Sequence, residues 1–169
     1  MELVTRVKAA SGKAYQIAPG GAVPGGRQYI DRAIHGADYC FDHVPSLVRG
    51  QTHILTAGND KMIDEAEPCL WLELARPATV YVVYADKLRL LPRWLEGYCD
   101  TREKITRTDS NPSTLKGIFT LFAQACDAGV VTLYGNLSTA MRDDPAFCAS
   151  GPLGTNYCMY SVIVAERTD

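Results

Sequence analysis

The stretch CLWLELARPATVYVVY, residues 69–84, decides the fold class. In residues 69–74, three leucines fall on one face of an extended chain, and Trp71 and Glu73 fall on the other. This alternation with a period of two is typical of a half-buried β-strand. Residues 79–84 are apolar on both faces, which predicts a central strand between the core and a second layer. We therefore predict two consecutive antiparallel strands joined by the short connection ARPA.

Further short apolar runs are bounded by Gly, Pro, Asn and Asp, the pattern of an all-β domain. The additional strands are expected at residues 14–18, 28–31, 51–56, 117–125, 129–134 and 157–166, with CDAG as the turn after residue 125. Single helical turns are expected at residues 45–49 and 91–98, each of which begins near a proline. Residues 57–68, 100–112 and 139–155 are expected to form surface loops because they are polar or rich in Gly and Pro.

These elements predict one domain over residues 1–169, an antiparallel β-sandwich of about eight strands with one or two short helical turns. A chain of 169 residues with 47% apolar and 21% charged residues can bury a core without a disulfide or a metal. The net charge is −2, and the Lys and Arg residues are scattered, so we do not expect nucleic-acid binding. No apolar run has the length of a signal peptide or a membrane span, so we expect a cytoplasmic protein without membrane contact. Association with the cytoskeleton or with an organelle is left open.

The six cysteines form no CxxC pair, and several lie within strand-like apolar runs. We expect reduced thiols, mostly packed as small hydrophobic side chains. The three histidines, His35, His43 and His53, have no spacing that implies a metal site, and we expect no metal and no other cofactor. The acidic segment at residues 59–68 lacks EF-hand spacing and is expected to be a solvated loop, with calcium binding left open.

The motifs that accompany common catalytic sites are missing. The sequence has no nucleophile elbow, P-loop or dinucleotide-binding fingerprint, and the glycines of residues 20–26 predict only turns. We expect no catalytic residues and no enzymatic activity. The sequence Asn136-Leu137-Ser138 matches a glycosylation sequon, which matters only if the chain is secreted.

Three blocks of the chain, taken together, resemble a known module. They are residues 29–61, which include YIDR and TAGNDK, residues 77–101, which include VYVVYAD and LPRWLEGY, and residues 128–164, which include AGVVTLYGN. They resemble a β-sandwich module attached to large extracellular bacterial proteins that degrade polysaccharides. The resemblance implies a jelly-roll fold similar to galactose-binding-like domains, and it supplies no catalytic residues.

We consider two functions from different classes. The first is a non-enzymatic interaction module, a structural or accessory subunit of a larger intracellular assembly that binds protein partners. The loop at residues 139–155 is low in charge and contains apolar side chains, which predicts that it packs on a partner protein. The expected partner-binding residues are Met141, Phe147 and Leu153, joined by Arg102, Lys104 and Arg107 from residues 100–112.

The alternative is a carbohydrate-binding module. Its candidate residues are Trp94 and Tyr98 in LPRWLEGY, because aromatic rings can stack on a sugar. Trp94 has apolar neighbours in the sequence, so a packing role remains open.

Overall fold

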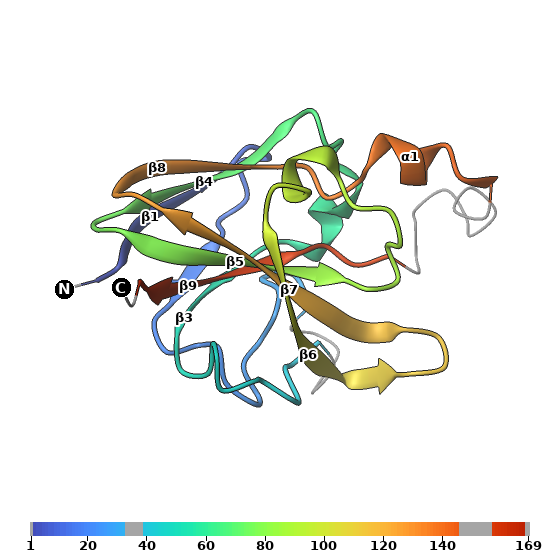
Figure 1. The fold of residues 1–169 in the computed structure, drawn as a ribbon, viewed down its shortest axis with the longest axis horizontal. Helices are drawn as coiled ribbons and strands as arrows, with labels where there is room; N and C mark the ends of the chain where they lie inside the picture. The colour runs from blue at the N-terminus through green and yellow to red at the C-terminus, as the bar shows by residue number, and fades with distance from the viewer. Residues whose placement is uncertain (1, 33–38, 146–156, 168–169) are drawn as a thin grey trace.

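The computed structural model describes residues 2–32, 39–145 and 157–167, which form two antiparallel sheets (Figure 1). The strands are β1 (Val4–Ala9), β2 (Gln16–Ala18), β3 (Thr52–Leu55), β4 (Pro68–Leu74), β5 (Ala78–Ala85), β6 (Cys99–Asn111), β7 (Lys116–Cys126), β8 (Gly129–Tyr134) and β9 (Ser161–Glu166). A three-stranded sheet has the order β1-β4-β8, and a six-stranded sheet has the order β2-β3-β9-β5-β7-β6. The short helical elements are the 3₁₀ turns η2 (Gly58–Met62) and η3 (Arg93–Leu95) and the single-turn helix α1 (Thr139–Arg142). The prediction of a β-sandwich with short helical turns is confirmed.

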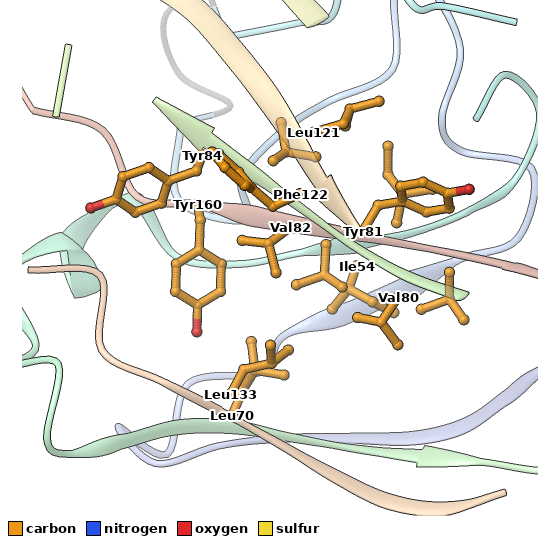
Figure 2. Close-up of a cluster of buried hydrophobic side chains, with 14 of the residues drawn as sticks. Ile54, Leu70, Val80, Tyr81, Val82, Tyr84, Leu121, Phe122, Leu133 and Tyr160 are labelled. Carbon is orange, nitrogen blue, oxygen red and sulfur yellow. The ribbon is translucent and has the colours of Figure 1, made fainter. Parts of the chain in front are cut away.

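The core lies between the two sheets. Leu70 and Leu133 of the three-stranded sheet point towards Ile54, Val80 and Val82 of the six-stranded sheet (Figure 2). All five side chains are fully buried. Each contributes on the order of 1.5–3 kcal/mol to folding by leaving water, so this interface fixes the pairing of the two layers.

The chain crosses repeatedly between the sheets. It does so from β1 to β2, β3 to β4, β4 to β5, β7 to β8 and β8 to β9. The expected antiparallel pairing of β4 with β5 is therefore wrong, and the CDAG turn leads from β7 to β8 in the other sheet. Residues 75–77 between β4 and β5 can span the separation of about 10 Å between packed sheets, since each residue reaches about 3.3–3.6 Å.

Strand β5 occupies the centre of the six-stranded sheet, between β9 and β7, as its two apolar faces predicted. A second layer covers the outer face of this sheet. It comes from the segment between β2 and β3, in which Phe41 and Val44 are fully buried. The ring of Phe41 packs edge-on against His53, with ring centroids 4.9 Å apart.

Strand β6 corrects the prediction of a polar loop at residues 100–112. It lies at the edge of the six-stranded sheet and pairs with β7 on one side. On its other side, the backbone of residues 106–108 bonds with residues 40–43, which include an isolated bridge between Phe41 and Arg107. An edge strand is wetted on one side and commonly carries charged residues, which prevent pairing with other chains. Ile105 and Arg107 are nevertheless buried, on the outer face of the sheet that the segment between β2 and β3 covers.

Other boundaries also differ from the predictions. Strand β1 was missed because its charged residues interrupt the apolar pattern, and β2 is shorter than the predicted strand at residues 14–18. Residues 28–31 form no strand and make only an isolated bridge between Tyr29 and Thr56. The predicted loops at 57–68 and 139–155 contain η2 and α1, and residues 146–155 lie outside the described residues.

The two ends of the described chain lie together, at the end of the sandwich away from α1 (Figure 1). The backbone of Leu3 accepts a hydrogen bond from Ala75 at 3.0 Å, and Arg76 forms an ion pair with Glu166. Within the described part of the chain, no helix is both long enough and apolar enough to cross a bilayer.

His53 predicts a pH dependence of stability. It is fully buried, its ring nitrogens have no partner among the described residues, and burial lowers its pKa from 6.5 to about 3. The unfolded chain therefore takes up this proton first as the pH falls. Stability is fully present above pH 6.5 and is lost progressively towards pH 3. Between pH 7 and pH 5, the unfolding free energy of the wild type should fall by about 2 kcal/mol relative to His53→Leu.

Urea denaturation at the two pH values measures this difference. The control is His43→Leu, which replaces an exposed histidine and should follow the wild type. Parallel curves for the wild type and His53→Leu would contradict the assignment of a buried neutral imidazole.

Candidate functional site

One end of the sandwich gathers most of the irregular structure. Strands β3, β5 and β8 finish there, and β4, β7 and β9 begin there. We call it the loop end; it lies opposite the two chain ends. The turns η2 and η3 and the helix α1 follow or precede these strands. Loops held by a rigid sheet are where binding residues concentrate, so this end is the candidate site.

The buried side chain of Asn136 holds the loop end together. Its Nδ2 donates to the carbonyl oxygen of Lys61 at 3.2 Å and to that of Cys158 at 3.1 Å. Its Oδ1 accepts from the backbone N–H of Tyr160 at 3.0 Å. The hydroxyl of Tyr84 donates to the backbone oxygen of Asn136 at 2.8 Å. One carboxamide therefore ties η2 and the start of β9 to the segment that follows β8.

Gly135 allows this arrangement because no larger residue would fit. A Cβ at this position would overlap the backbone oxygens of Ile63 and Asp64. Its N–H donates to the carbonyl of Glu67 at 2.9 Å, and the N–H of Leu137 donates to that of Ile63 at 3.0 Å. The backbones on either side of Gly135 thus pack directly against each other.

The same contacts bury the asparagine of the glycosylation sequon. Asn136 has an exposed fraction of 0%, and its nitrogen donates two hydrogen bonds. Ser138 is also buried, and its hydroxyl caps α1 by accepting from the N–H of Met141 at 3.1 Å. In the folded chain this asparagine is a structural residue.

A shallow groove of about 350 Å³ lies on one side of this clamp. We call it the tryptophan groove, and it is lined by Glu65, Ala66, Arg93, Trp94, Tyr134 and Thr139. The indole N–H of Trp94 donates to the carbonyl oxygen of Gly135 at 2.9 Å. The Trp94 ring also packs edge-on against Tyr98 and Tyr160, with centroids 5.8 and 5.5 Å away. The ring is therefore fixed in place.

Glu65 is the carboxylate of the tryptophan groove, and it joins two loops. Its oxygens accept from the backbone N–H of Arg93 at 2.7 Å and from that of Thr139 at 3.1 Å. Burial would raise the pKa of Glu65, but these N–H donors outweigh it and hold the pKa below its usual value. The carboxylate is therefore ionised at neutral pH.

A second cavity, of about 170 Å³, lies at the same end beside η2. We call it the basic pocket. Its lining residues are Tyr29, Arg32, Tyr39, Gly58, Lys61, Lys87, Arg107, Lys116, Tyr157, Cys158 and Met159. Five of these side chains are cationic and none is acidic. The positive charge is thus concentrated in one place within a chain of net charge −2.

The two arginines of the basic pocket are held by an aromatic ring. The guanidinium carbon of Arg107 lies 4.8 Å from the ring centroid of Tyr39, and that of Arg32 lies 5.8 Å from it. Arg107 has an exposed fraction of 1%, and its Nη2 donates to Asp109 at 3.2 Å. Burial opposes the charge of Arg107, but nearby groups, Tyr29 first, outweigh it and raise its pKa. The guanidinium is therefore permanently charged.

The residues predicted to bind a protein partner do not form one surface. Met141 is 3% exposed and packs into the core, so its prediction as a partner contact is wrong. Arg107 is buried in the basic pocket, so its prediction as a polar contact on a loop is also wrong. Arg102 is exposed, and Lys104 pairs with Asp86 at 2.7 Å. The remaining two, Phe147 and Leu153, lie outside the described residues.

The aromatic pair predicted for carbohydrate lies at the loop end. Trp94 lines the groove, whereas Tyr98 packs beside it and is not among the lining residues. Burial raises the pKa of Tyr98. Tyr134, which sequence reasoning missed, is 36% exposed and supplies the second aromatic ring of the groove.

Two carboxylates of the acidic segment at residues 59–68 are bound by other side chains of the same chain. The carboxylate of Asp60 is buried and is bound by Ser11 at 2.7 Å, Tyr15 at 2.6 Å and Lys13. Asp64 pairs with Arg142 at 2.7 Å. Among the residues that the structure describes, no group of three or more His, Cys, Asp or Glu side chains could hold a metal ion.

The five described cysteines are unpaired. Cys69 is buried, as expected for a core thiol, and burial raises its pKa. Cys40, Cys126 and Cys158 are partly buried, and Cys99, at the start of the edge strand, is exposed.

Comparison with solved structures gives one match, "The structure of a beta-glucuronidase from glycoside hydrolase family 2". The TM-score is 0.73 and the sequence identity is 17%, over 98% of this chain and 15% of that chain. The chain therefore spans a small part of that enzyme's length. No family model matches the sequence, and no curated protein matches it. The similarity confirms the expected fold, a β-sandwich.

The Asn136 clamp predicts a large loss of stability on truncation. Asn136→Ala leaves two partly buried carbonyl groups and one buried N–H group without this partner, and an unsatisfied buried group costs about 1–3 kcal/mol. We expect the unfolding free energy to fall by about 3 kcal/mol or more.

Thermal and urea unfolding measure this loss. Asn59→Ala is the matched control, because Asn59 is exposed on the same turn, η2, and should lose less than about 1 kcal/mol. Equal losses for the two variants would show that Asn136 is not the clamp.

Proposed function

We propose that this chain is a non-catalytic carbohydrate-binding domain that takes a neutral sugar in the tryptophan groove. The observation that carries the proposal is the immobilised ring of Trp94, which lines the groove together with the partly exposed ring of Tyr134. An aromatic face buries the apolar face of a sugar ring, and a ring that is already fixed loses little entropy on binding.

Polar groups around these rings suit the hydroxyls of a sugar. Arg93 and Thr139 line the groove, and Glu65 supplies charged acceptor oxygens. A few placed polar groups around an aromatic floor are the usual composition of a small-ligand site. The volume of about 350 Å³ lies at the lower end of the range for such sites.

The position of the groove supports a role within a larger protein. The loop end lies opposite the two chain ends. Neighbouring domains that join at the chain ends would therefore leave the groove uncovered. The structural neighbour is a glycoside hydrolase, in which a domain of this fold occupies about 15% of the chain. A sugar-binding accessory role fits both observations.

The arrangement of carboxylates favours binding over catalysis. Glycoside hydrolysis ordinarily uses two carboxyl groups that flank the scissile bond. In the described residues, Glu65 is the single carboxylate that lines the groove, and backbone N–H groups already engage both of its oxygens. The alternative of a protein-binding subunit loses Met141 and Arg107 as contacts, because both are buried.

Substitutions in the groove should remove sugar binding. Trp94→Ala and Tyr134→Ala are each expected to weaken the affinity for a neutral oligosaccharide by about tenfold or more, through loss of ring stacking. A glycan array identifies the best neutral ligand, and isothermal titration calorimetry measures the affinity.

Trp71→Ala is the matched control, because Trp71 is a half-buried tryptophan on the three-stranded sheet, outside the groove. It should bind like the wild type. The absence of neutral glycan binding by the wild type, or a loss confined to Trp71→Ala, would contradict the proposal.

A further inference from the structure

We propose that the basic pocket is a second binding site, which takes an oxyanion. Its ligand is the carboxylate of an acidic sugar or a phosphate or sulfate group, which share the negative oxygens that arginine and lysine recognise. The site is separate from the tryptophan groove, and it stands whether or not the groove binds a neutral sugar.

Positive charge in the pocket exceeds the local negative charge. The five cations of its lining are Arg32, Lys61, Lys87, Arg107 and Lys116. Two carboxylates lie within ion-pair distance of them: Asp31 pairs with Arg32 at 3.2 Å, and Asp109 pairs with Arg107 at 3.0 Å and with Lys116 at 3.7 Å. The cavity therefore carries about three uncompensated positive charges.

Asp31 and Asp109 are also engaged by other groups. Asp31 accepts from the backbone N–H groups of Gly58 at 2.7 Å and Asn59 at 3.0 Å, so it also fixes the start of η2. Asp109 is shared between two cations. In the described part of the chain, no carboxylate lies within ion-pair distance of Lys61 or Lys87. These two lysines are the cations available to a ligand.

The surroundings of Lys61 lower its pKa. Burial lowers its pKa, and the charge of Arg32 lowers it further. A bound anion would oppose both effects by stabilising the ammonium form. Lys61 is also well positioned, since its backbone oxygen is held by Asn136.

The arginines provide a rigid base for the site. Arg107 lies between the rings of Tyr39 and Phe119, with its guanidinium carbon 4.8 and 5.3 Å from their centroids. Arg32 packs on the same Tyr39 ring and donates to the side chain of Asn59 at 3.0 Å. Two like charges on one ring repel each other, and an anion bound between them would relieve that repulsion.

The size of the cavity selects a small ligand group. A volume of about 170 Å³ holds several water molecules at roughly 30 Å³ each, and hence a carboxylate or phosphate with part of a ring. A nucleic-acid backbone would need an extended basic track, whereas the charge here is confined to one cavity in an acidic chain.

The test uses the whole chain with three probes: an oligogalacturonide, inorganic phosphate with inorganic sulfate, and the neutral oligosaccharide chosen on the array. The key variant combines Lys61→Ala with Lys87→Ala. Lys8→Ala is the matched control, because it removes an exposed lysine from the three-stranded sheet. Lys61→Arg preserves the charge and tests for rescue.

We expect the wild type to bind at least one anionic probe, with affinity that falls as salt is raised. The double alanine variant should lose at least tenfold in that affinity, while Lys8→Ala, Lys61→Arg and Trp94→Ala stay within about twofold. Tighter binding of the oligogalacturonide identifies an acidic sugar, and tighter binding of phosphate or sulfate identifies those groups; either result supports the site.

Two outcomes would overturn this inference. One is the absence of anion binding by the wild type, and the other is an equal loss for Lys8→Ala and the double variant, which would indicate nonspecific charge attraction. The neutral probe separates the two proposals, because its binding depends on Trp94 and not on the two lysines. Thermal unfolding of the double variant should match the wild type, since both lysines are only partly buried.

Discussion

The carboxamide of Asn136 is the interaction on which the loop end depends. It bonds with two backbone oxygens and one backbone N–H, which belong to two separate segments, η2 and the residues just before β9. Since a buried amide with every polar atom paired is rigid, the residues attached to those segments are rigid as well. Trp94 is fixed through the neighbouring carbonyl of Gly135, and Lys61 is held through its own carbonyl. The tryptophan groove and the basic pocket therefore share one support.

The two layers of the sandwich supply the frame for this clamp. Strand β5 runs through the middle of the larger sheet, and its residue Tyr84 reaches Asn136 from the core. The apolar residues of β4 and β5 predicted the fold class correctly, because their spacing along a strand indicates whether one or both of its faces are buried. Pairing was not predictable in the same way. Two strands that are consecutive in the sequence can pair in one sheet or lie in different sheets. Residues 75–77 are long enough to connect the two sheets. The edge strand β6 was missed because its wetted side carries charges.

The candidate site residues likewise divide into those that the sequence predicted and those that it did not. Trp94 was predicted from its chemistry as a sugar contact, and it lines a groove at the loop end. Met141 was misassigned because an apolar residue in a polar segment can cap a core as readily as it can contact a partner. The basic pocket was missed because its cations come from five separated positions, and only the fold brings them together. One signal was available: the blocks YIDR, TAGNDK and YGN, which carried the family resemblance, supply Arg32, Lys61 and Asn136 to this end.

The central claim is that the loop end is a preorganised face with two binding sites, one on each side of the Asn136 clamp. Backbone amide chemical-shift mapping by NMR tests it most directly, with the neutral oligosaccharide and the anionic probe titrated in separate experiments. The account predicts shifts around Trp94 and Gly135 for the neutral ligand, and shifts around Gly58 and Lys61 for the anion. Shifts centred on Trp71 of the three-stranded sheet, or at the end that holds the chain termini, would contradict it.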